Sequence, residues 1–177
     1  MDATEASNVA RLLQQCHAGF GFLAHALLPA NREKTLTAIL SELPQGEAYG
    51  HAVFGFSAMA FIYTHQYVYE ALGQPASILE PIDVAQLGVT TNDGPAGEDP
   101  RAGCLRHLRN SFAHGRWSAT SDGVRITRVT LHDGRGNQET FRAECDATVL
   151  ADTAERVLIA AHAAVAAVAA VPASGAP

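Results

Sequence analysis

Cysteine is scarce in this chain, and none of it is arranged as a pair or a cluster. Cys16, Cys104 and Cys145 stand far apart, and no CxxC or Cys/His zinc pattern surrounds them. This spacing argues against a disulfide framework and against a structural zinc site. We interpret the three cysteines as small apolar side chains in a reducing compartment.

Long apolar runs are also missing, because His, Gln, Tyr or Glu interrupts each one before it reaches the length of a membrane span. The N-terminus, MDATEASNVARLL, has neither the basic start nor the apolar core of a secretory signal. The sequence therefore predicts a cytoplasmic protein without a membrane partner.

Basic residues are outnumbered: 12 Lys and Arg stand against 18 Asp and Glu, for a net charge of −6. This balance excludes nucleic-acid binding by a generally basic surface, since such binding depends on Lys and Arg displacing phosphate counterions. One segment differs from the rest. Residues 101–116 hold four of the twelve basic residues and two histidines but no acid, so any contact with RNA is expected to be local.

What the sequence does contain is a helical pattern over most of its length. The 177 residues are 47% hydrophobic, which predicts one domain over residues 1–171 and a disordered tail at 172–177. Apolar residues spaced by threes and fours predict helices at 5–28, 31–43 and 48–72, the third of them largely buried. A last helix is predicted from Asp146 or Thr148 to about residue 171.

Between these helices lie one long loop, one further helix and one hairpin. Residues 74–100 are rich in Pro and Gly and predict an ordered loop with a short helix at about 82–87. Asp99 and Pro100 fit the cap and first position of a helix that ends at Gly115. The runs GVRITRVTLHD and NQETFRAECD around the turn GRGN predict a β-hairpin. The predicted fold is an all-α bundle of four to five helices with a small β-hairpin inserted before the last helix.

Polar residues of chemical interest gather on the helix that ends at Gly115. Asn110 and His114 are four residues apart and share a helix face, whereas Arg109 and His114 differ by roughly 140°. Because the helix is expected to end just after His114, the imidazole of this residue should be accessible. An accessible imidazole can donate or accept a proton near neutral pH. Arg106 and Arg116 lie beside these residues as candidate phosphate contacts. The same residues also suit an ordinary helix C-terminus, which favours Arg and His.

The order Arg109-Asn110-Ser111-Phe112-Ala113-His114, followed by Gly115-Arg116-Trp117, resembles the RNxxxH motif of HEPN proteins. The predicted layout, in which a hairpin and a final helix follow the motif helix, is similar to small plasmid- or prophage-type HEPN subfamilies. The resemblance implies a HEPN-like bundle acting as a metal-independent endoribonuclease in a toxin, phage-defence or stress response.

The resemblance also assigns roles. His114 would move the proton, Arg109 would stabilise negative charge, and Asn110 would orient the phosphate or the histidine, with a cyclic phosphate as product. It implies a homodimer that brings two motifs to one cleft, with RNA as substrate and an antitoxin protein as a further candidate partner. It implies neither a metal ion nor a cofactor.

Two other interpretations stay open. The chain could be a non-catalytic HEPN module that binds a nucleotide, RNA or a protein partner, or a structural helical protein in which Arg109 and His114 lie apart or buried. On the third predicted helix, His65 and Tyr69 are four residues apart and are either satisfied core groups or part of the cleft. Trp117 is expected to be buried rather than to stack on a base.

Overall fold

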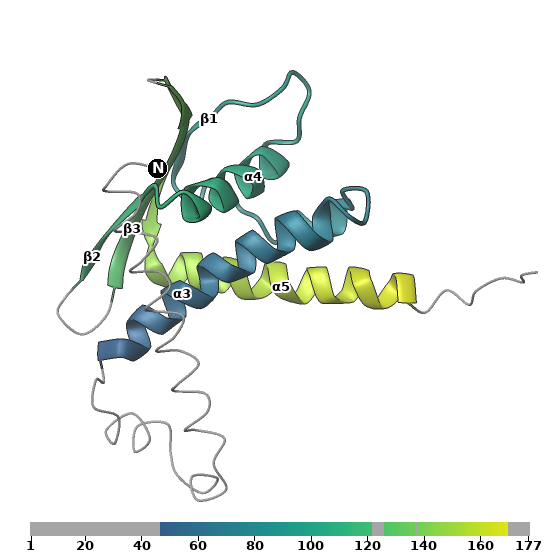
Figure 1. Cartoon of the computed structure of the whole chain (residues 1–177), viewed down its shortest axis with the longest axis horizontal. Coiled ribbons are helices and arrows are strands. Elements are labelled where there is room, and N and C mark those ends of the chain that lie inside the picture. The colour runs from purple at the N-terminus through teal and green to yellow at the C-terminus, as the bar shows by residue number, and fades with distance from the viewer. Residues whose placement is uncertain (1–46, 122–125, 137, 170–177) are drawn as a thin grey trace, which may run out of the picture.

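The computed structural model describes residues 47–121, 126–136 and 138–169, which form helices packed on a four-stranded antiparallel sheet (Figure 1). The helices expected at 5–28 and 31–43 and the tail expected at 172–177 lie outside the described residues. Within the described part of the chain, no helix combines the length and the apolar character that a membrane span requires.

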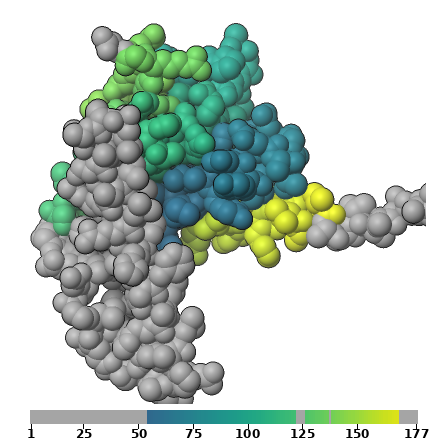
Figure 2. Space-filling model, in the orientation of Figure 1, coloured from purple at the N-terminus to yellow at the C-terminus, as the bar shows by residue number. Residues whose placement is uncertain are grey.

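The third and last predicted helices are confirmed. Helix α3, Glu47–Tyr63, continues directly into a π-helical segment, η2, Thr64–Tyr69, and the chain then turns at Gly73 and Gln74, which both have positive φ. Helix α5, Ala147–Ala169, packs along α3. On the face shown in Figure 2, the blue side chains of α3 and η2 lie between the green and teal elements above and α5, in yellow, below.

The predicted hairpin is confirmed as well. Strand β3, Ile126–Arg135, and strand β4, Gln138–Asp146, are antiparallel, with Arg135 opposite Gln138 at the turn. Side chains on one face of the two strands are fully buried, as the period of a strand predicts. These are Val129, Leu131, Phe141 and Ala143, each 0% exposed.

The expectation of an all-α bundle is wrong, because this hairpin is the centre of a larger sheet. Strand β1, Val89–Asn92, pairs with β4, and strand β2, Trp117–Ser121, pairs with β3, which gives the order β1-β4-β3-β2. Strand β1 has only four residues inside a Pro- and Gly-rich stretch, and β2 buries only its first residue. Neither strand therefore carries the alternation by which strands are recognised.

The long segment before α4 also differs in detail from the prediction. It contains a short 3-10 helix, η3, Ala76–Ile78, and the short helix expected at 82–87 is a single turn instead. The carboxylate of Asp83 accepts hydrogen bonds from the backbone nitrogens of Ala85 and Gln86 and so closes that turn locally.

The helices cover the buried face of the sheet. Helix α4, Pro100–Ala113, contacts β1 and β3, helix α5 contacts β3 and β4, and α3 lies against both helices (Figure 1). The core between these layers contains Cys104 and Cys145, as predicted from the sequence, whereas Cys16 lies outside the described residues. Burial raises the pKa of the Cys104 thiol to about 12. The fold thus combines a sheet and a helical layer around one core.

Candidate functional site

Helix α4 begins where the sequence predicts. The carboxylate of Asp99 accepts a hydrogen bond from the backbone nitrogen of Arg101 at 2.8 Å, and Pro100 occupies the first helical turn. A cap of this kind satisfies a backbone donor that the helix itself cannot pair. The start of α4 is therefore fixed by its own sequence.

The end of α4 is fixed in the same way and determines where His114 lies. Gly115 has a φ of 66°, the backbone nitrogen of Arg116 donates to Ser111 O at 2.7 Å, and that of Gly115 donates to Phe112 O at 3.2 Å. This pair of bonds is a Schellman motif, which favours glycine at the left-handed position. It leaves His114 exposed at the helix end and directs Arg116 back toward the sheet.

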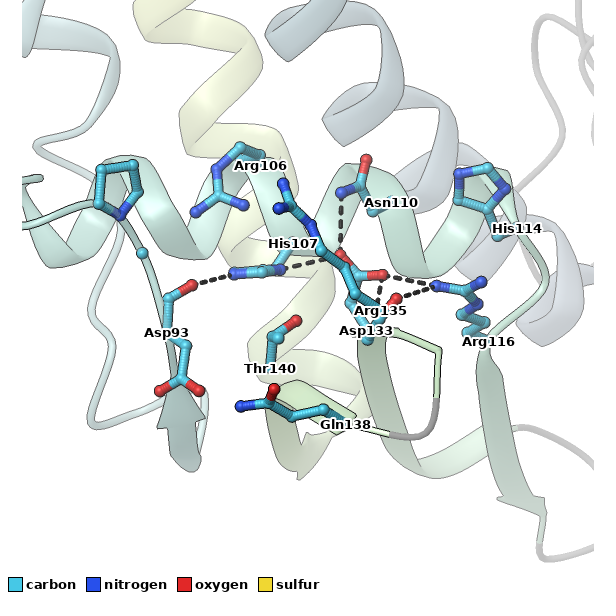
Figure 3. Close-up of a pocket in the computed structure, with 13 residues that line it drawn as sticks. Asp93, Arg106, His107, Asn110, His114, Arg116, Asp133, Arg135, Gln138 and Thr140 are labelled. Carbon is cyan, nitrogen blue, oxygen red and sulfur yellow. Dashed lines mark hydrogen bonds and ion pairs between the residues drawn. The ribbon is translucent and has the colours of Figure 1, made fainter.

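An open groove of about 660 Å³ runs between α4 and the tip of the β3–β4 hairpin. We call it the motif groove (Figure 3). Four of the five predicted site residues line it, and Arg109 does not. The lining side chains of polar or charged character are Asp93, Arg106, His107, Asn110, His114, Arg116, Asp133, Arg135, Gln138 and Thr140.

Asp133 of β3 connects the polar residues of the groove. Its Oδ2 accepts hydrogen bonds from His107 Nδ1 and Asn110 Nδ2, each at 2.9 Å, and its Oδ1 accepts from Arg116 Nη1 at 2.8 Å and from Gly134 N at 2.9 Å. Burial raises the pKa of this carboxyl, but the hydrogen bonds from His107 and Asn110 outweigh it and hold the pKa well below its usual range. Asp133 is thus an ionised carboxylate that orients two predicted site residues.

His107 ties α4 to the sheet on the other side of this carboxylate. Its Nδ1 faces Asp133, and its Nε2 lies 2.9 Å from the backbone oxygen of Asp93. Both partners are acceptors, so the two hydrogen bonds form together only when both ring nitrogens carry a hydrogen. The ring also stacks on Phe141, with centroids 5.0 Å apart. His107 is therefore held on three sides.

Arg109 lies outside the motif groove but is connected to it through Asn110. Its Nη1 donates to Asn110 Oδ1 at 2.8 Å and its Nη2 donates to Gln66 Oε1 at 3.1 Å. The Asn110 amide is therefore held at both ends, since its oxygen accepts from Arg109 while its nitrogen donates to Asp133. Within the single chain, Arg109 is therefore placed to orient Asn110.

The remaining basic side chains of the groove differ in whether another residue holds them in place. Arg106 forms an ion pair with Glu98 at 2.9 Å, whereas no acid among the described residues pairs with Arg135, whose side chain points toward α4 in Figure 3. His114 is exposed, and no hydrogen bond to a described residue holds its ring. Among the described residues, no three His, Cys, Asp or Glu side chains cluster as metal ligands would. The chemical resources of the groove are an accessible imidazole and several guanidinium groups.

Asp133 and Arg135 are groove residues that were not predicted from the sequence. Asp133 continues the inward alternation of Val129 and Leu131, so an acid at a core-facing strand position was a usable signal. Arg135 carried no such signal, because nothing in the sequence placed the hairpin tip beside α4. Trp117 is 3% exposed and packs edge-on against Phe54, which confirms its expected burial.

Comparison with known proteins identifies the family. A family model described as HEPN pEK499 p136 matches residues 8–163, a span that contains the whole motif groove. Searches of the curated proteins and of the solved structures found no match. Since the family model covers most of the chain, the protein belongs to the HEPN pEK499 p136 family.

Proposed function

We propose that this HEPN protein is a metal-independent endoribonuclease and that the motif groove is its active site. The observation that carries the proposal is that the exposed imidazole of His114 opens into the same groove as the guanidinium groups of Arg106, Arg116 and Arg135. In a chain with a net charge of −6, such a local concentration of cations favours a phosphate group.

The proposed reaction uses the ribose 2′-hydroxyl as nucleophile. The 2′-oxygen forms a bond to phosphorus while its proton passes to the imidazole of His114, and the bond between phosphorus and the 5′-oxygen breaks. The leaving 5′-oxygen takes up a proton from water, and the hydroxide that remains accepts the proton from His114, which restores the imidazole. The products are a 2′,3′-cyclic phosphate and a 5′-hydroxyl, and no metal ion takes part.

The surrounding residues would stabilise the charge that develops on phosphate. Arg106, Arg116 and Arg135 offer donors to the phosphate oxygens, and the side chain of Arg116 is oriented beforehand by Asp133. Asn110 would contact the phosphate or His114 from a fixed amide. Within one chain, Arg109 would act by holding the Asn110 amide. In a homodimer that brings two copies of the groove together, Arg109 would contact the phosphate directly.

We further propose a homodimer. Three exposed apolar side chains, Met59, Tyr63 and Tyr67, follow one another at intervals of four residues on α3 and η2. Tyr67 neighbours Gln66, the hydrogen-bond partner of Arg109. A second copy on this face would bury the apolar side chains and bring two motif helices close together. In the cytoplasm such a dimer would act in a toxin, phage-defence or stress response, with an antitoxin protein as its inhibitor.

One observation favours a second candidate, a HEPN module that binds a nucleotide, RNA or a protein partner without cleaving RNA. Both terminal nitrogens of Arg109 are engaged by Asn110 and Gln66, and Arg109 does not line the groove that holds His114. Such a module keeps the cationic groove but lacks a direct contact from Arg109 to the phosphate.

Incubating purified protein with a mixed RNA pool in EDTA, and identifying the ends of any products, separates the two candidates. The ribonuclease proposal predicts fragments with 2′,3′-cyclic phosphate ends, none from a strand with 2′-deoxyribose at the cut site, and strongly reduced cutting by Arg109→Ala. Toxicity on expression should disappear with His114→Ala. A folded dimer that binds RNA yet leaves it intact would reject the ribonuclease proposal in favour of the binding module.

A further inference from the structure

A second cavity, of about 400 Å³, lies beside the motif groove and contains His65 and Tyr69. We call it the His65 cavity. Its walls come from the end of η2, from η3 and from the segment that leads into α4. Arg106 lines both this cavity and the motif groove, so the two spaces are neighbours that share one guanidinium group. The other lining residues are Glu70, Gln74, Ala76, Leu79, Gly97, Glu98, Asp99 and Ala102.

His65 is a buried polar group, and one of its nitrogens has no hydrogen-bond partner among the described residues. The residue is 8% exposed, its Nδ1 makes no hydrogen bond within the part of the chain that the structure describes, and Glu70 Oε1 is 3.7 Å from that nitrogen. Burial lowers the pKa of His65, and the nearby charges of Arg109 and Arg106 lower it further, although Glu70 and Glu98 act in the opposite direction. A neutral imidazole can both donate and accept a hydrogen bond.

The backbone around this cavity is unusual as well. His65 and Tyr69 stand on the π-helical segment η2, and Gln74, a non-glycine residue with a φ of 64°, lines the same cavity. Short π-helical segments and left-handed non-glycine residues both occur more often near functional sites than elsewhere.

The cavity is rich in hydrogen-bond acceptors, and one of its acids is available. Glu98 is paired with Arg106 at 2.9 Å, and Asp99 is paired with Arg101 at 2.7 Å. Glu70 is largely exposed, and among the described residues its recorded ion-pair contact is the one to His65. A ligand that enters the cavity therefore meets a carboxylate able to accept two hydrogen bonds.

From these observations we propose that the His65 cavity is a base-recognition subsite that prefers guanine in single-stranded RNA. This proposal rests on the proposed function, since it assumes that the neighbouring motif groove holds an RNA phosphate. Arg106 would then lie between a bound base and the phosphate next to it. Single-stranded RNA is commonly read in this way, with unstacked bases hydrogen-bonded along their edges.

The acceptor-rich wall selects guanine by its pattern of donors. The pairing edge of guanine presents two adjacent N–H donors, which match the two oxygens of one carboxylate, here Glu70. Uracil presents a single N–H between two carbonyl oxygens. The negative charge of the same carboxylate repels these two oxygens. The apolar side chains of Ala76, Leu79 and Ala102 offer contacts to the faces of a planar ring.

Nucleosides test the subsite without involving cleavage, because they have no phosphate to cut. Guanosine and uridine are titrated into the full chain while backbone amide and histidine ring signals are followed by NMR. We expect guanosine to shift signals of η2 and of His65 at lower concentrations than uridine. Glu70→Gln should weaken guanosine binding by about tenfold, the loss typical of one bidentate base contact, while Glu155→Gln on α5 serves as the matched control.

The outcomes separate this proposal from the proposed function. Preferential guanosine binding that Glu70→Gln weakens supports the subsite, even if the protein cuts no RNA. Equal effects of guanosine and uridine, or guanosine binding that Glu70→Gln leaves unchanged, overturn the subsite, even if RNA is cut in the motif groove. Since Glu70 is exposed, its substitution is expected to leave the fold intact, and a circular dichroism spectrum checks this.

Discussion

Asp133 accepts hydrogen bonds from three side chains and one backbone amide, and its side chain is 7% exposed. Removing this carboxylate leaves the cationic partner Arg116 and the ring of His107 without their shared acceptor. We expect Asp133→Ala to lower the free energy of unfolding by about 3–5 kcal/mol, as when one partner of a buried ion pair is deleted.

Glu139→Ala provides the control for Asp133, since Glu139 forms an exposed ion pair with Arg142, three residues later on the same strand, β4. A pair of this kind contributes about 1 kcal/mol or less. Denaturant unfolding of both variants measures the difference. Equal, small losses would mean that the Asp133 network does not hold α4 on the sheet.

His65 makes a prediction about pH, because burial lowers its pKa in the folded chain. At a pH below the ordinary pKa of a histidine, this side chain binds a proton in the unfolded chain but not in the folded one. The stability of the fold should therefore fall as the pH falls. The contribution is at most about 1.4 kcal/mol per pH unit and begins as the pH falls through about 6.5, the ordinary pKa of a histidine. His65→Gln should flatten this dependence, whereas His162→Gln, at an exposed position on α5, should not. Parallel pH profiles for the two variants would contradict the assignment.

Among the elements, the short strand β1 is tied to the sheet by Gly88. Gly88 has a φ of 60°, and a Cβ atom there would collide with the backbone oxygen of Glu144 on β4. Gly136 has a similar φ of 58°, but no atom of the described residues lies within 4 Å of its Cβ position. Alanine at either position meets the same backbone strain, of about 1 kcal/mol.

Comparison of Gly88→Ala with Gly136→Ala therefore isolates the contact between β1 and β4. We expect Gly88→Ala to cost about 1–3 kcal/mol more than Gly136→Ala in thermal or denaturant unfolding, because the backbone must shift to remove the collision. Equal costs would show that β1 does not pack on β4 as described.

Several elements could be predicted because their signals are local. Asp99 and Gly115 bound α4 through caps that depend on neighbouring residues, and the alternation of Val129 and Leu131 indicates β3 directly. Strand β2 could not be predicted because it buries only its first residue, and strand β1 could not because its pairing is long-range. Strand β1 joins β4 about fifty residues later in the chain, as in the pair Val89 and Ala143, and it has little alternation of its own.

The site residues also divide into those that local sequence could predict and those that depend on the tertiary structure. Asn110 and His114 face one groove because their spacing of four residues is a property of any helix. The buried acid that holds Asn110 comes from β3, and the position of Arg109 depends on Gln66 of η2, so both needed the tertiary structure. Helical spacing did show that Arg109 and His114 start from different faces of α4.

For the whole molecule, the proposed homodimer predicts a mass in light scattering of twice the 18.6 kDa of one chain. Tyr67→Glu would bury a charge in the proposed interface and should shift the protein toward the monomer. Ile159→Glu on α5 is the control, since Ile159 is similarly exposed, at 62%, but lies on another helix. A monomeric wild type, or a dimer that Tyr67→Glu leaves intact, would contradict the proposed interface.

The central claim is that the exposed imidazole in the motif groove carries out the chemistry. Its most direct test is the rate of RNA cleavage in EDTA by wild type, His114→Ala and His162→Ala, each checked for an unchanged fold. Both histidines are exposed, and only His114 lines the groove. We expect His162→Ala to cut like the wild type and His114→Ala to lose about 100-fold or more of the rate, as when a general acid–base group is removed. Equal cleavage by the two variants, or none by any of the three proteins, would contradict the account.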